Sequence, residues 1–169
     1  VIGTFQDGSG NPSWNGWTHY DITQPTDIRW LVDTFFAVTG TYSAWCGAEF
    51  ALCAGDTDGR GYGNTWNEML EWRGAVANNG LSCSVTVTAN IRHDSEPGYD
   101  FTFLSHEKFD QGILDIASWD GSGLVAVNET FVYATGDYMG ANSDEVVVLF
   151  RFESDGAWSD QDCLFPTIS

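Results

Sequence analysis

Closely spaced carboxylates are the first candidates for a functional site in this sequence, because such side chains can bind a cation together. Asp56 and Asp58 stand two residues apart, directly before a glycine, in the stretch Asp56-Thr57-Asp58-Gly59. That spacing lets both carboxylates face one hard cation, and Ca²⁺ prefers such oxygen ligands. The loop lacks the remaining acidic positions of an EF-hand, so an acidic turn without an ion is the alternative.

Other acidic residues extend this calcium hypothesis. The candidate ligands are Asp7, Asp56, Asp58, Asp155, Asp160 and Asp162. Bound calcium is therefore a possible cofactor, and it would offset part of the formal net charge of −18. A salty environment or simple solubility would also explain that charge.

Catalytic motifs are absent from the sequence: it has no nucleophile elbow, no zinc-protease motif and no phosphate-binding loop. His19, His93 and His106 lie on unrelated segments, where a histidine is more often a packing residue than a catalyst. Glu96 and Asp100 have the residue types of a glycosidase acid and base. Because 24 acidic residues produce such pairs by chance, we expect a protein that is not an enzyme.

Four of the eight tryptophans stand beside small or polar residues in expected loops. They are Trp14, Trp17, Trp119 and Trp158. A flat ring in a loop can stack on a sugar or fill a partner's pocket, and burial in the core is the alternative. Asn128 opens an Asn-Glu-Thr tripeptide that fits the glycosylation acceptor pattern.

Four cysteines indicate two disulfides and an oxidising compartment. Cys46 and Cys53 are close enough in sequence to close one loop, and Cys83 and Cys163 would then tie a middle strand to the C-terminal segment. This is one of three possible connectivities. The spacing does not match a zinc site. The stretch 53–72 is interpreted as a disulfide-closed loop that leads into a core strand.

Charge and hydropathy argue against nucleic-acid and anionic-membrane partners and against a place inside the membrane. With 24 acidic and 6 basic residues, the surface would repel nucleic acid and anionic membranes. No apolar run approaches the ~20 residues of a membrane helix, so membrane insertion is not expected. The chain starts at Val1 without a signal peptide and reads as a mature or excised segment of a secreted protein.

Short strands are the elements that must position these residues. A chain of 169 residues with 43% hydrophobic content fits one domain, residues 1–169. Strands are expected at 29–38, 42–46, 67–72, 83–91, 99–105, 112–119, 130–134 and 145–152. Alternation over 83–91 predicts one wet face, and the apolar run of 145–152 predicts a central strand. Seven or eight such strands predict an all-β antiparallel sandwich.

Three stretches in the same order carry a resemblance to a known family. They are GTFQDG…WNGWTHYD, SAWCG…C…GYGNTWNEMLEW and VVVLFRFESDGAWSDQD. The sequence resembles the jelly-roll accessory domains of secreted bacterial proteins, which are the MAM-like and cleaved-adhesin-like modules beside proteases and cell-surface anchors. The resemblance implies a jelly roll of two packed sheets, an extracellular setting, adhesive or accessory binding and often structural calcium.

The sequence departs from that family at two places. Gln6 stands where the family has an acidic residue, which removes one charged ligand near Asp7. The family continues into a final Asp-containing strand, whereas this sequence stops at Ser169. An open sheet edge exposes unpaired backbone groups and invites strand addition, so self-association is a further possibility.

These observations support three functional hypotheses. The leading one is a non-catalytic extracellular adhesion module at a cell surface that recognises a glycan or a protein. The second is a structural subunit that self-assembles into a surface layer or filament. The third is a carbohydrate-active enzyme, since jelly rolls can host paired acids.

Overall fold

The computed structural model describes residues 5–23, 30–34, 37–49, 60–77 and 80–159. The strands are β1 (Trp17–Asp21), β2 (Trp30–Asp33), β3 (Ser43–Cys46), β4 (Ala48–Glu49), β5 (Arg60–Gly61), β6 (Asn67–Ala75), β7 (Cys83–Asp94), β8 (Phe101–Lys108), β9 (Gly112–Trp119), β10 (Ser122–Tyr133) and β11 (Glu145–Glu153). These residues contain no helix that could cross a membrane.

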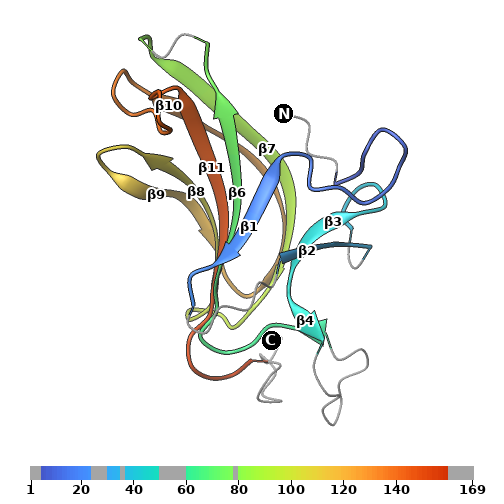
Figure 1. Ribbon diagram of the computed structural model, residues 1–169. Helices are drawn as coiled ribbons and strands as arrows, with labels where there is room; N and C mark the ends of the chain where they lie inside the picture. Colours follow the sequence, from blue (N-terminus) through green and yellow to red (C-terminus); the bar gives the residue numbers. More distant parts are fainter. Residues whose placement is uncertain (1–4, 24–29, 35–36, 50–59, 78–79, 160–169) are drawn as a thin grey trace.

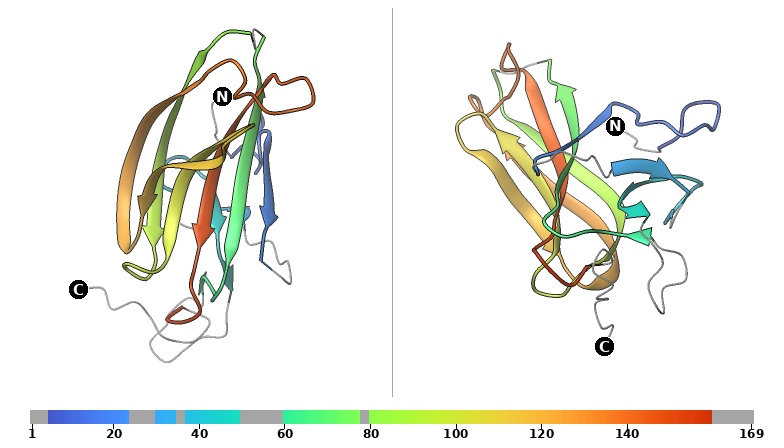
Figure 2. Two further views of the ribbon diagram at one scale, coloured as in Figure 1. Left: turned by 90° about the vertical axis from the view of Figure 1, so that its left-hand side faces the viewer. Right: turned by 60° about the horizontal axis from the view of Figure 1, so that its bottom comes forward.

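Two antiparallel sheets build the body of the protein. The larger one has five strands in the order β1-β6-β11-β8-β9, and Figure 1 views it with β7 and β10 behind it. β7 and β10 form a two-stranded sheet that packs on one face of the larger sheet, as the left view of Figure 2 shows. The short pairs β2–β3 and β4–β5 are separate. The described chain is therefore all-β, and its arrangement is sandwich-like.

Sequence patterns predicted most of the long strands. β7 alternates between half-buried and exposed residues along its whole length, which confirms the wet face expected for 83–91. β11 is the middle strand of the five-stranded sheet, as its apolar run predicted. β9 has the predicted bounds, whereas β10 begins at Ser122 and is much longer than the predicted 130–134.

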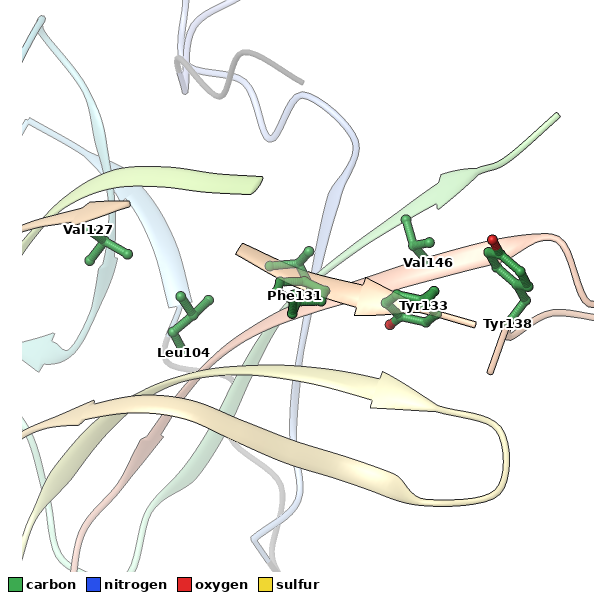
Figure 3. Packing of buried hydrophobic residues seen from close by; sticks show 7 residues of the cluster. Leu104, Val127, Phe131, Tyr133, Tyr138 and Val146 are labelled. Carbon is green, nitrogen blue, oxygen red and sulfur yellow. The ribbon is translucent and has the colours of Figure 1, made fainter. Parts of the chain in front are cut away.

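The main core lies between the two sheets. Its buried residues are Leu104, Val127, Phe131, Tyr133, Tyr138, Val146 and Val148, which Figure 3 shows as sticks, all but Val148 labelled. They come from β8, β10, β11 and the connection that contains Tyr138. A second, smaller cluster of Tyr62, Trp66 and Phe152 lies next to Cys46.

Tyr133 joins three strands through one hydroxyl group. Its side chain has no exposed surface, and its ring stacks on Tyr138 with the centroids 5.7 Å apart. The hydroxyl oxygen lies 2.5 Å from the Glu107 carbonyl oxygen and accepts the Val147 N–H at 3.1 Å. Burial raises the pKa of Tyr133 to about 12. The hydroxyl therefore remains protonated and available as a donor at neutral pH.

His106 places an ionisable ring inside the same core. The residue is 7% exposed, its ring centroid lies 4.4 Å from that of Phe131, and its Nδ1 is buried without a hydrogen-bond partner. Burial lowers the pKa of His106, and the charge of Lys108 lowers it further, whereas Asp137 acts in the opposite direction. The folded protein therefore favours the neutral ring.

Stability should consequently fall in mild acid. A histidine whose pKa is lowered by folding binds its proton more readily in the unfolded chain, so stability declines as the pH drops through about 6.5, the ordinary value. Urea unfolding between pH 8 and pH 5 measures this decline. The His106→Gln variant should show a flatter profile over that interval. An equally steep profile in the variant would show that other groups cause the decline.

Candidate metal centre

Three carboxylates from distant parts of the sequence meet at one end of the sheets. Glu96 lies in the turn after β7, Asp100 directly precedes β8, and Asp155 follows β11 by two residues. Each offers a ligand oxygen, and these oxygens all lie within 4.8 Å of one another. Among the described residues, this is the only such group of acidic, histidine or cysteine side chains.

The turn between β7 and β8 fixes the first two carboxylates. The Ser95 hydroxyl donates to the Asp100 carbonyl at 2.9 Å, and the Asp100 N–H donates to the Glu96 carbonyl at 3.1 Å. The turn also requires a positive φ of 85° at Gly98, which glycine adopts without steric cost. The Gly98 N–H donates to the Asp120 carboxylate at 2.6 Å, which ties the turn to the loop after β9.

The segment after β11 brings in the third carboxylate. The Asp155 N–H donates to Oδ1 of Asp100 at 2.8 Å, and the Asp155 carbonyl accepts from Thr65. The neighbouring Ser154 hydroxyl donates to the Gly63 carbonyl at 2.6 Å and accepts the Trp66 N–H at 2.9 Å. Backbone contacts therefore hold Asp155 against both Asp100 and the connection before β6.

Burial makes this cluster electrostatically unfavourable without a cation. Asp100 has no exposed surface, and its Oδ2 is buried without a hydrogen-bond partner. Burial raises the pKa of Asp100, and a hydrogen bond with Tyr62 and the Asp155 N–H oppose this effect. The pKa of Glu96 is raised first by burial and then by the charges of Asp100 and Asp155.

The donor set fits a hard divalent cation. Carboxylate oxygens are the preferred ligands of Ca²⁺, which takes six to eight oxygens in a flexible geometry. Within the described chain, none of the three carboxylates forms an ion pair with lysine or arginine. A cation there would satisfy Oδ2 of Asp100 and remove the repulsion among the three charges.

The structure uses only part of the ligand set predicted from sequence. It brings Asp155 together with Glu96 and Asp100, which the sequence suggested as a pair of acids rather than as ligands. Asp7 instead accepts the backbone N–H groups of Ser9 and Asn11 in an exposed turn, and these bonds lower its pKa. The remaining candidates, Asp56, Asp58, Asp160 and Asp162, lie outside the described residues.

The candidate ligand-binding tryptophans have different surroundings. Trp14 is half-buried and packs against His19, with the ring centroids 4.3 Å apart and the ring planes tilted by 35°. Trp17 and Trp119 are half-buried and pack against the main core. Trp158, which is 49% exposed, follows Asp155 by three residues. It is therefore the one of the four that combines high exposure with a place near the carboxylate cluster.

The cysteines and the glycosylation tripeptide lie elsewhere. No disulfide joins Cys46 to Cys83, and their predicted partners Cys53 and Cys163 are not among the residues that the structure describes. The predicted pairing therefore stays a prediction. Asn128 is exposed on β10, where its Oδ1 accepts from the Thr88 hydroxyl at 3.4 Å.

Comparison with protein-family models and with curated proteins finds no match for this sequence.

Proposed function

We propose that this chain is a calcium-binding β-sandwich of the jelly-roll type that serves as a non-catalytic binding module outside the cell, with a glycan or a cell-surface protein as its ligand. The observation that carries the proposal is the fully buried Asp100, whose Oδ2 has no partner and which shares a cluster with Glu96 and Asp155. A bound cation accounts for all three carboxylates at once.

The path of the chain supports the jelly-roll assignment. β7 and β10 pair with each other in the smaller sheet. β8 and β9, which lie between them in the sequence, pair in the larger sheet. The chain therefore crosses between the layers after β7 and returns after β9, as in Greek-key and jelly-roll sandwiches. The resemblance to MAM-like modules supports the extracellular setting.

The accessibility of the carboxylates supports binding over catalysis. A glycosidase needs both of its carboxyl groups to reach the scissile bond. Asp100 has no exposed surface, so it cannot meet a polysaccharide that approaches from solvent. The same burial suits a structural ligand, because a buried charge is stabilised by a coordinated metal ion.

Calcium titration of chelator-treated protein tests the proposal. Isothermal titration calorimetry should detect a Ca²⁺ site that Glu96→Gln and Asp155→Asn each weaken by about tenfold or more, since ligand charge tunes affinity. Glu129→Gln, on the exposed face of β10, is the matched control and should bind like the wild-type protein. Calcium binding that is absent, or unchanged in both cluster variants, would refute this site.

A second candidate function rests on the smaller sheet. Among the described strands, β7 and β10 pair only with each other, so each has a backbone edge available for strand addition. This favours self-assembly as the alternative. Light scattering of the same calcium-loaded and chelated samples separates the two, since a monomer in both conditions argues against assembly.

A further inference from the structure

In the segment after β11, an exposed tryptophan lies between a hydrogen-bonded residue and a buried one. At one end, the Ala157 N–H donates to Oδ1 of Asp155 at 2.9 Å. At the other end, Ser159 has no exposed surface. Trp158 lies between them and is 49% exposed. The local structure therefore presents this ring to solvent instead of folding it into the core.

The backbone of Trp158 is also strained. Its φ is 64°, in the left-handed region where a Cβ atom crowds the following carbonyl, and a bulky residue there is a genuine outlier. Thr65, which donates its N–H to the Asp155 carbonyl, has a φ of 58°. Two of the four described non-glycine residues with positive φ thus contact or closely follow Asp155.

Strain and exposure at one residue point to a ligand. Glycine at position 158 would relieve the backbone, whereas Trp158 keeps a positive φ and leaves half of its surface exposed to solvent. Strained conformations of this kind concentrate at binding and catalytic sites, where the surrounding structure holds a side chain ready for its target.

The carboxylate cluster, one of whose members precedes Trp158 by three residues, is exposed to solvent at Asp155. Asp100 is fully buried and Glu96 half-buried, whereas Asp155 is exposed. Three carboxylates leave some of the six to eight positions of Ca²⁺ available for other oxygens. Since consecutive Cα atoms are about 3.8 Å apart, the Cα atoms of Asp155 and Trp158 lie within about 11 Å of each other. A ligand of one or two sugar rings spans that distance.

We infer that Trp158 is the stacking residue of a carbohydrate site whose second element is the cation held by Glu96, Asp100 and Asp155. A sugar ring offers a flat C–H face to the indole and neighbouring hydroxyls to the ion's open positions. The net charge of −18 disfavours anionic polysaccharides, so the ligand is a neutral glycan. This inference rests on the proposed calcium site and deepens it by assigning a ligand class and a contact residue.

Binding to immobilised neutral glycans tests the inference with the full chain. The probes are oligosaccharides of mannose, glucose, galactose and xylose, each measured with calcium and with a chelator. At least one should bind in calcium and be released by the chelator. Trp158→Gly and Trp158→Ala should each weaken that binding by about 30-fold or more, the effect of losing a tryptophan anchor. Calcium affinity measured by calorimetry should stay unchanged.

Trp158→Gly provides a second readout, because its midpoint of urea denaturation should be higher than that of Trp158→Ala: both variants lose the ring, and only glycine relieves the positive φ. The matched control is Ser143→Gly, which relieves a positive φ of 51° before β11, at the opposite end of that strand. It should bind glycan like the wild-type protein. Calcium binding without retention of any glycan, or glycan binding that survives Trp158→Gly or the chelator, would overturn this inference and leave the calcium site standing. Failure to bind calcium would instead refute the proposed function itself.

Discussion

Replacing Tyr133 with phenylalanine should lower the free energy of unfolding by about 2–4 kcal/mol, because unpaired buried backbone groups cost roughly 1–3 kcal/mol each. The Tyr133 hydroxyl donates to the Glu107 carbonyl and accepts the N–H of the fully buried Val147. Phenylalanine keeps the ring and its packing, but it leaves both backbone groups without this partner. Urea denaturation at pH 7 measures the loss.

Tyr138→Phe is the matched control for that experiment. Tyr138 also lies in the core, but its hydroxyl donates to the carbonyl of Leu81, a residue that is 65% exposed. Water replaces the lost donor there, so the expected cost is at most about 1 kcal/mol. Equal losses in the two variants would show that the bonds of the Tyr133 hydroxyl to β8 and β11 stabilise the protein no more than the bond of the Tyr138 hydroxyl to Leu81.

Without calcium, the Asp100→Asn variant should be at least as stable as the wild type, whereas with calcium it should be less stable than the wild type. Without calcium, the wild type differs from Asp100→Asn mainly in carrying a buried charge, so the variant should be equal in stability to the wild type or about 1 kcal/mol more stable. The asparagine Oδ1 still accepts the Asp155 N–H that Oδ1 of Asp100 accepts in the wild type. With calcium at 100 times the dissociation constant, the wild type should gain about 2.7 kcal/mol and the variant much less.

Urea denaturation with chelator and with calcium measures both states of each protein. Glu129→Gln again serves as the control, because it removes one negative charge from an exposed strand position. It should gain the same stability from calcium as the wild type. If Asp100→Asn gained as much as its parent, the buried carboxylate would have no part in binding the ion.

Sequence patterns predicted the strands whose burial is regular. We found β7 from the alternation of 83–91 and β11 from the apolar run of 145–152. Both predictions were right because each pattern reflects which faces of the strand are exposed to solvent. β1, with the sequence WTHYD, and the first half of β10 were missed. Polar and small residues break the pattern there, and pairing with β6 and β7 determines the strand instead.

The candidate metal centre could be predicted only in part from the sequence. Glu96 and Asp100 were noticed as a pair, and Asp155 was noticed as a possible ligand, but nothing in the sequence joined them. What joins them is the antiparallel register of β8 and β11, in which Phe101 pairs with Glu153. That register depends on long-range pairing, and a search based on local spacing favoured Asp56 and Asp58.

The central position of β11 has a consequence for the order of folding. β6 and β8 do not pair with each other, since β11 lies between them and pairs with both. Until β11 is inserted, β1–β6 and β8–β9 are two separate antiparallel ribbons. β6 and β11 are far apart in the sequence, and non-local pairing of this kind slows folding. We therefore expect the large sheet to be completed only when β11 pairs with both β6 and β8, and the same pairing brings Asp155 beside Asp100.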